Sequence, residues 1–157
     1  MGDLLRPVLV SILAYPRAPD FVEGPGDLST WEPGDPTYFG TAIDLYIGGT
    51  DDPDGATDSF ATILCSPSWL KDHITDIQTD DPQESVWQTG LPYRTGRGLW
   101  LMPRWDHDAF SRDLDTLLTQ AAGPTWPVVA NRLSRHLDWE YDYRFDDAIG
   151  RSPVDLR

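Results

Sequence analysis

Residues 125–147, with the sequence TWPVVANRLSRHLDWEYDYRFDD, contain two hydrophobic periodicities in direct succession. From residue 139 onward, aromatic residues alternate with charged ones. Before that point, apolar residues recur every three or four positions, at Trp126, Val129, Ala130, Leu133 and Leu137. Spacing of three or four places side chains on one face of an α-helix, and alternation places them on one face of a β-strand. The stretch therefore predicts a helix that leads into a strand with one aromatic and one mostly acidic face.

The rest of the chain carries the signals of further strands and helices. Apolar or alternating runs predict strands over residues 8–15, 41–47, 59–65 and 99–103. Because the strands come mainly first and the longer helices late, we expect an α+β fold, a mostly antiparallel β-sheet packed against two or three helices. We expect a single domain over residues 1–157, with residues 1–40 and 148–157 partly irregular, since no break in composition marks a second domain.

Capping residues mark three helix starts. Ser66 precedes Pro67, and a hydroxyl followed by proline at the first helical position is typical of a helix N-terminus. Asp106 or Asp108 is expected to cap the next helix, and Thr125 the last one. The middle helix should be amphipathic, because its apolar residues form one stripe at Phe110, Leu114, Leu117, Leu118 and Ala121.

The charge, the cysteine content and the N-terminal apolar run exclude several classes of partner, site and location. The formal net charge is -14, and such an acidic chain is a poor ligand for a nucleic-acid backbone or an anionic membrane, so we expect neither. The one cysteine, Cys65, excludes a disulfide within the chain and a cysteine-rich zinc site. The apolar run over residues 7–16 is too short to span a bilayer and lacks the pattern of a signal peptide. We therefore expect a cytoplasmic protein.

Few residues point to catalysis or metal binding. Asp106, His107 and Asp108 could orient an imidazole for general base catalysis. Acidic residues in the first turn of a helix are, however, also expected because they complement the helix dipole. No histidine stands in a recognised metal-binding spacing. We therefore expect no catalytic residue, no metal and no cofactor.

Three segments, in this order, resemble a known family. They are residues 60–70 (FATILCSPSWL), residues 98–106 (GLWLMPRWD) and residues 126–141, which begin with WPVVANRLSR and end with WEY. Together they resemble the immunity protein 8 family of bacterial polymorphic-toxin systems, over residues 43–142. Ser66 stands where threonine is usual in that pattern, and Tyr141 stands where it has phenylalanine.

The resemblance implies a non-enzymatic protein that binds and neutralises a cognate toxin. The matching Trp69, Trp126, Leu133 and Trp139 are expected in the core, which leaves the acidic loops and faces for binding. A nuclease toxin would have a basic surface to hold phosphates, and acidic groups would attract it. The expected toxin-binding residues are Asp51, Asp52, Asp54, Asp58, Asp76, Asp80, Asp81, Glu84, Glu140 and Asp142.

Two alternative functions stay open at this point. One is a small hydrolase-like enzyme that uses Asp106, His107 and Asp108, which would require the three side chains to converge in a concave pocket. The other is a protein-interaction module whose partner is not a toxin.

Overall fold

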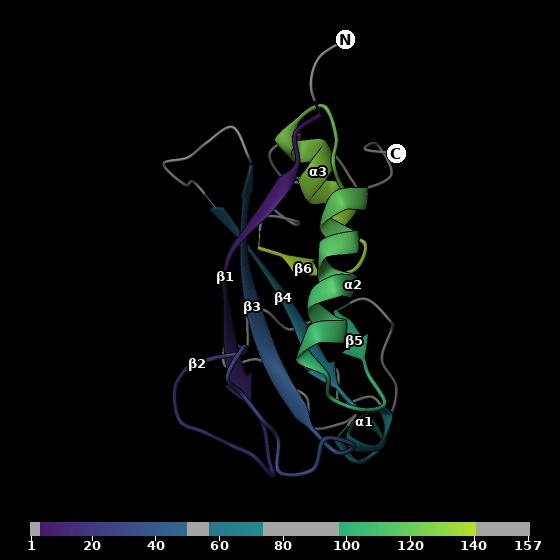
Figure 1. Cartoon of the computed structure of the whole chain (residues 1–157). Helices are drawn as coiled ribbons and strands as arrows, with labels where there is room; N and C mark the ends of the chain where they lie inside the picture. The colour runs from purple at the N-terminus through teal and green to yellow at the C-terminus, as the bar shows by residue number, and fades with distance from the viewer. Residues whose placement is uncertain (1–3, 50–56, 74–97, 141–157) are drawn as a thin grey trace.

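The computed structural model describes residues 4–49, 57–73 and 98–140, and it confirms the α+β prediction (Figure 1). Within these residues the strands form one sheet in the order β2-β1-β3-β4-β5, and β6 also pairs with β4. Neighbouring strands are antiparallel except β4 and β5, which are parallel. In chain order the elements are β1 (Pro7–Pro16), β2 (Gly26–Asp27), β3 (Gly40–Gly49), β4 (Thr57–Cys65), α1 (Pro67–His73), β5 (Leu99–Leu101), α2 (His107–Gln120), α3 (Trp126–Leu133) and β6 (Asp138–Trp139).

The hairpin of β3 and β4 forms the centre of the sheet. Its register pairs Leu45 with Phe60 and Ile43 with Thr62. Alternate residues of β3, among them Ile43, Leu45 and Ile47, are fully buried, whereas Asp44 and Tyr46 between them are only half-buried. This period-2 pattern confirms the predicted strands and shows that one face of the sheet carries the main core.

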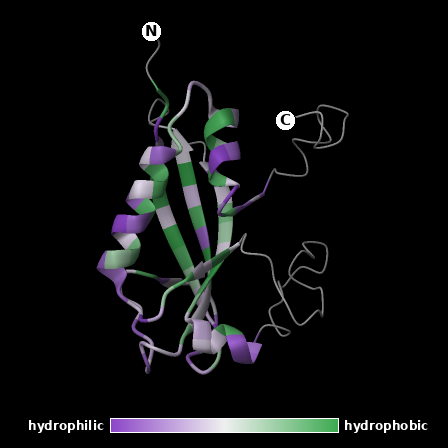
Figure 2. Ribbon diagram, turned by 90° about the vertical axis from the view of Figure 1, so that its right-hand side faces the viewer, coloured by the Kyte–Doolittle hydropathy of each residue, from purple (hydrophilic) through white to green (hydrophobic). Residues whose placement is uncertain are grey.

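Helices α2 and α3 cover that core face. Figure 2 shows the largely hydrophobic strands between the two helices, with hydrophilic residues of α2 turned outward. Helix α2 buries Phe110, Leu114 and Leu118, three members of its predicted apolar stripe. Burying each such side chain contributes about 1.5–3 kcal/mol, so the stripe is a principal attachment of the helix to the sheet.

The predicted helix starts are confirmed at two side chains. The Ser66 hydroxyl accepts a hydrogen bond from the Trp69 N–H at 3.3 Å, and the Asp106 carboxylate accepts one from the Ala109 N–H at 3.1 Å. Thr125 stands at the N-cap of α3, but its side chain makes no capping hydrogen bond. Trp126 and Pro127 still begin the helix there, and Pro127 fits a first turn because it has no N–H to satisfy.

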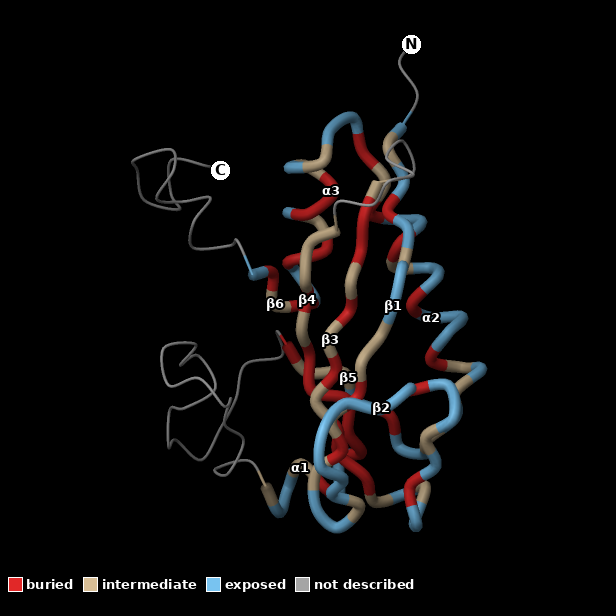
Figure 3. The backbone as a smooth tube through the Cα atoms, turned by 90° about the vertical axis from the view of Figure 1, so that its left-hand side faces the viewer, coloured by how far each residue is buried: buried red, intermediate tan, exposed pale blue. Residues whose placement is uncertain are grey.

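Three features differ from what the sequence patterns predict. The first strand is apolar on both sides, which indicates burial on both faces or a central position, but Val8 and Val10 are 41% and 62% exposed on the part of β1 that the helices do not cover (Figure 3). Residues 16–38 are rich in Pro, Gly and Asp, as is typical of a loop, and they contain the short strand β2. Helix α3 ends at Leu133 rather than Leu137, because a turn over residues 134–136 brings the chain back toward β4. Residues 141–147 of the expected aromatic strand lie outside the described residues.

A second apolar cluster surrounds Cys65 at the end of β4. Cys65 is fully buried beside Ile63 and Trp69. The Trp69 ring packs so closely on Gly40 that a Cβ atom there would lie 2.2 Å from it. The Trp69 indole N–H also donates to the Ala18 carbonyl at 2.7 Å, which ties α1 to the loop after β1. Burial raises the pKa of the Cys65 thiol to about 12.

One carboxylate joins α3, β4 and β6 at the other end of the sheet. The indole N–H groups of Trp126 and Trp139 both donate to the same Asp58 oxygen, at 2.8 Å and 3.0 Å. The Trp139 ring also stacks on Phe60, with centroids 6.3 Å apart. We call this arrangement, the Asp58 carboxylate with the Trp126 and Trp139 indoles, the Asp58 clasp. It explains why tryptophan stands at both positions, since only an indole supplies an apolar ring and an N–H donor together.

Glu140 forms two hydrogen bonds with β4 in the same region. Its carboxylate accepts a hydrogen bond from the Ser59 N–H at 2.7 Å, and its own N–H donates to the Ser59 carbonyl at 3.1 Å. These two bonds extend the pairing of β6 with β4 by one residue, next to the Asp58 clasp.

Cys65 should resist thiol reagents as long as the protein is folded. At pH 8 we expect reaction with a disulfide reagent to be slow for the native protein and fast in urea, because only the thiolate reacts and burial disfavours it. Because the folded-state pKa lies above that of an unfolded thiol, the unfolded state ionises first as the pH rises. The free energy of unfolding should therefore fall between about pH 9 and 12 more steeply in wild type than in Cys65→Ala. Equal slopes in the two proteins would contradict the burial of this thiol.

Removal of the shared acceptor should destabilise the fold. We expect Asp58→Ala to lower the free energy of unfolding by roughly 2 kcal/mol, because two indole donors lose a charged partner. Asp58→Asn should lose about half as much, since its amide oxygen still accepts a hydrogen bond. Urea titration followed by tryptophan fluorescence measures both. Asp113→Ala, at an exposed position of α2, is the control and should change stability by less than about 0.5 kcal/mol. Equal stability of Asp58→Ala and this control would show that the clasp contributes nothing.

Candidate functional site

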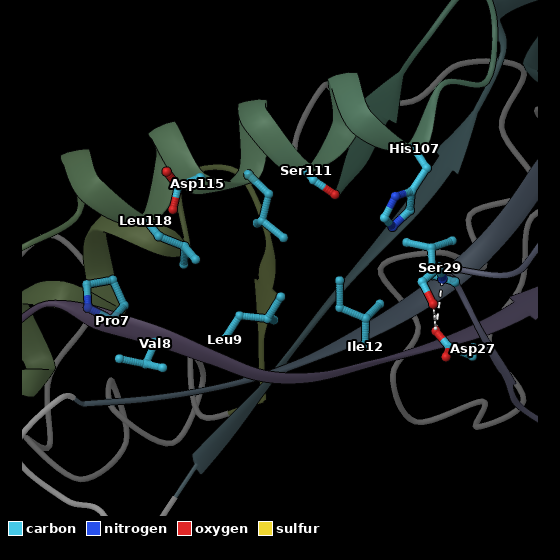
Figure 4. Close-up of a pocket in the computed structure, with 12 residues that line it drawn as sticks. Pro7, Val8, Leu9, Ile12, Asp27, Ser29, His107, Ser111, Asp115 and Leu118 are labelled. Carbon is cyan, nitrogen blue, oxygen red and sulfur yellow. Dashed lines mark hydrogen bonds between the residues drawn. The ribbon is translucent and has the colours of Figure 1, made fainter.

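A groove lies between β1 and α2 in the described part of the chain (Figure 4). It has a volume of about 590 Å³ and is open to solvent along one side. Strand β1 forms one wall, α2 forms the other, and residues of β2 and the turn after it close one end. The lining residues are Pro7, Val8, Leu9, Ile12, Asp27, Leu28, Ser29, His107, Ser111, Leu114, Asp115 and Leu118.

The floor of the groove is apolar. Leu9 and Ile12 lie on the helix-facing side of β1, and in Figure 4 their side chains point toward α2. Leu114 and Leu118 face them from the helix, one turn apart. A surface of this kind favours apolar side chains of a ligand over a small polar substrate.

The rim of the groove is polar and carries two carboxylates. Asp27, at one end, accepts hydrogen bonds from the Ser29 hydroxyl at 2.8 Å and from the Ser29 N–H at 2.9 Å. These bonds lower the pKa of the Asp27 carboxyl, which therefore stays ionised at neutral pH. Asp115 stands on α2 and is exposed, and His107 lies near Asp27. The rim therefore presents two carboxylates beside an apolar floor.

The three residues considered for catalysis do not converge. Asp106 caps α2 through the Ala109 N–H, whereas His107 lines the groove and has a side chain that is 38% exposed. The Asp108 side chain is 96% exposed, and its carboxylate lies 3.9 Å from His107 Nδ1. A general base needs an orienting partner within hydrogen-bond reach and a pocket for substrate, and this arrangement supplies neither for the trio as a unit.

No group of three metal-ligating side chains occurs in residues 4–49, 57–73 and 98–140. No helix among them is long and apolar enough to cross a membrane.

Of the acidic residues expected to bind a toxin, Asp58 and Glu140 lie in the described part of the chain. Both carboxylates accept hydrogen bonds from their own fold, Asp58 from two indoles and Glu140 from the Ser59 N–H. The other eight lie outside the described residues: Asp51, Asp52, Asp54, Asp76, Asp80, Asp81, Glu84 and Asp142.

The groove itself was missed by the sequence reasoning. Its walls come from β1 and α2, which are about a hundred residues apart in the chain, and no local pattern joins them. The sequence held a partial signal of an uncovered surface on this strand. Val8, Leu9 and Val10 make both sides of the strand apolar, although one layer of helices can cover only one side.

Comparison with known proteins identifies the family. The model of the family described as Immunity protein 8 matches residues 20–143. No curated protein and no solved structure matches the chain. The matched range contains β2 to β6 with all three helices, and it includes the Asp58 clasp and part of the groove. It also covers the three segments on which the resemblance rested. The chain therefore belongs to the immunity protein 8 family.

Proposed function

We propose that this protein binds and neutralises a cognate toxin of a bacterial polymorphic-toxin system. The observation that carries the proposal is the family match, which extends over residues 20–143 and includes every described helix and strand except β1. Neutralisation by tight association requires a stable scaffold and a complementary surface, and it requires no catalytic group. The separate placement of Asp106, His107 and Asp108 gives no support to the hydrolase-like alternative.

The charge of the chain supports a basic partner. A net charge of -14 creates a negative potential that speeds the encounter with a positively charged protein. A nuclease has such a surface because it must hold phosphates, so we propose a nuclease domain as the toxin. The proposed location is the cytoplasm, where a nuclease would reach nucleic acid. The ten acidic residues named from the sequence stay proposed contacts, with Asp58 and Glu140 also serving the fold.

Co-expression tests the proposal directly. We expect the gene beside this one to encode a toxin domain that arrests growth when it is produced alone. Production of this protein with the toxin should restore growth, whereas an unrelated toxin domain should stay lethal. A folded, soluble protein that fails to protect against its genomic neighbour would contradict the proposal and favour an interaction module with another partner.

The association rate should depend on salt. If acidic groups steer a basic toxin, we expect the rate constant to fall about tenfold or more between 50 and 500 mM NaCl, because ions screen long-range attraction. The dissociation rate should change much less. Stopped-flow mixing with a catalytically inactive toxin domain measures both. A salt-independent association rate would show that charge attraction plays no part, while binding itself could persist.

A further inference from the structure

Strand β1 has one open edge that the described residues leave uncovered over part of its length. On one side, β3 pairs with β1 from Pro7 to Pro16. On the other side, β2 pairs only with Leu13 and Ala14. Beyond the opposite end, Leu5 forms an isolated bridge with Gly123. The open edge therefore comprises residues 7–12, between two places where backbone partners are already present.

The open edge is apolar and solvent-exposed, which is unusual for an edge strand. Val8 and Val10 expose 41% and 62% of their surface. Natural sheets commonly protect such edges with charged residues or proline. Here Pro7 stands at one end, and a bulge between Leu9 and Ser11 interrupts the regular ladder. The bulge lies within the open edge, and β2 at one end and the Leu5–Gly123 bridge at the other limit an added strand to about six residues, or roughly 20 Å.

The groove lies where a strand added to this edge would point its side chains. In a strand, alternate side chains face opposite sides of the sheet. Those of an added strand that face the helices would enter the space between β1 and α2, against Leu9, Leu114 and Leu118. The residue directly after β2 lies in this way, because Leu28 is 1% exposed and packs in the main core. An added strand would continue the line of β2.

Charge decides between the possible occupants. The acidic rim at Asp27 and Asp115 complements lysine or arginine beside the apolar residues of a bound strand. A second copy of this chain would bring another net charge of -14 to the same place and another acidic rim, which opposes self-association. Complementarity therefore favours a basic partner over a second copy.

We propose that residues 7–12 of β1 and the β1–α2 groove receive an extended segment of the toxin as an additional antiparallel or parallel strand. The segment carries apolar side chains at alternate positions, and lysine or arginine at its ends. Its backbone pairs with β1, its apolar side chains fill the groove, and its cationic groups lie beside Asp27 and Asp115. This inference rests on the proposed function, because the toxin supplies the strand.

A matched pair of charge reversals on α2 tests the acidic rim. Asp115→Lys changes a residue that lines the groove, and Asp113→Lys makes the same change at an exposed position of α2 that does not line it. We expect Asp115→Lys to weaken binding of the inactive toxin domain roughly tenfold by calorimetry. Asp113→Lys should stay within about threefold of wild type. Circular dichroism and thermal melting verify that both variants fold.

A second pair tests the apolar edge. Val8→Lys places a charge on the open edge, whereas Val22→Lys places it at an exposed position in the loop before β2. The edge variant should lose at least tenfold in affinity and the loop variant should not. Hydrogen–deuterium exchange of the wild-type protein adds a readout that needs no substitution. Among residues 8–12, the amides that point away from β3 should gain protection when the toxin binds, because strand pairing gives them acceptors.

The outcomes separate the inference from the proposed function. If wild type neither protects against nor binds its genomic neighbour, the proposed function fails, and this inference fails with it. If wild type binds but Asp115→Lys and Val8→Lys match their controls and these amides gain no protection, this inference alone is overturned. Sedimentation velocity provides the last check, because it measures whether the protein is a dimer. If wild type is a dimer and Val8→Lys is a monomer, the edge binds a second copy of this chain, and the choice of the toxin as occupant is overturned.

Discussion

The fold depends on one carboxylate that two tryptophans share. Asp58 lies on β4, whereas its donors Trp126 and Trp139 belong to α3 and β6, 68 and 81 residues further along the chain. The contact therefore joins β4 to α3 and β6, the last two described elements, which follow it in the chain after α1, β5 and α2. A charged acceptor is effective there because it satisfies two indole N–H groups whose rings are already packed on Phe60. The aromatic residues supply burial, and the carboxylate selects the arrangement of α3 against the sheet.

Local patterns were sufficient to predict most of the elements, although not β2 or the end of α3, and insufficient to predict how distant elements meet. The alternation in β3, the apolar stripe of α2 and the caps at Ser66 and Asp106 are all visible within a few residues, and the structure confirms them. The end of α3 was misplaced because Leu137 stands four residues after Leu133, as the next apolar residue of a helix would. Leu137 is indeed buried, but it reaches the core through the turn over residues 134–136. The role of Asp58 and the groove both arise from long-range pairing, which leaves no periodic trace in the sequence.

The acidic residues of this chain divide into structural and surface groups, and the division clarifies why family membership does not specify a partner. Asp58 and Glu140 accept hydrogen bonds within the matched scaffold, where a substitution would disturb the sheet. Asp115 accepts no such bond from a neighbouring element among the described contacts and stands at the rim of the groove. Members of one family can keep the first kind of residue and vary the second, so a shared fold is compatible with different toxins.

The two edges of the sheet differ in a way that bears on the stoichiometry of assembly. The outer edge of β4 is shared by two short strands, with β6 beside Phe60 and Ala61 and β5 beside residues 63–65. At the opposite side of the sheet, β1 is paired on its outer edge by the two residues of β2. Among the described strands, β1 therefore keeps the longest unpaired stretch, residues 7–12, which ends at β2 on one side and at the Leu5–Gly123 bridge on the other. A stretch closed at both ends accepts one short strand and gives a finite complex with a single partner, whereas an edge without such ends can propagate into a chain of molecules.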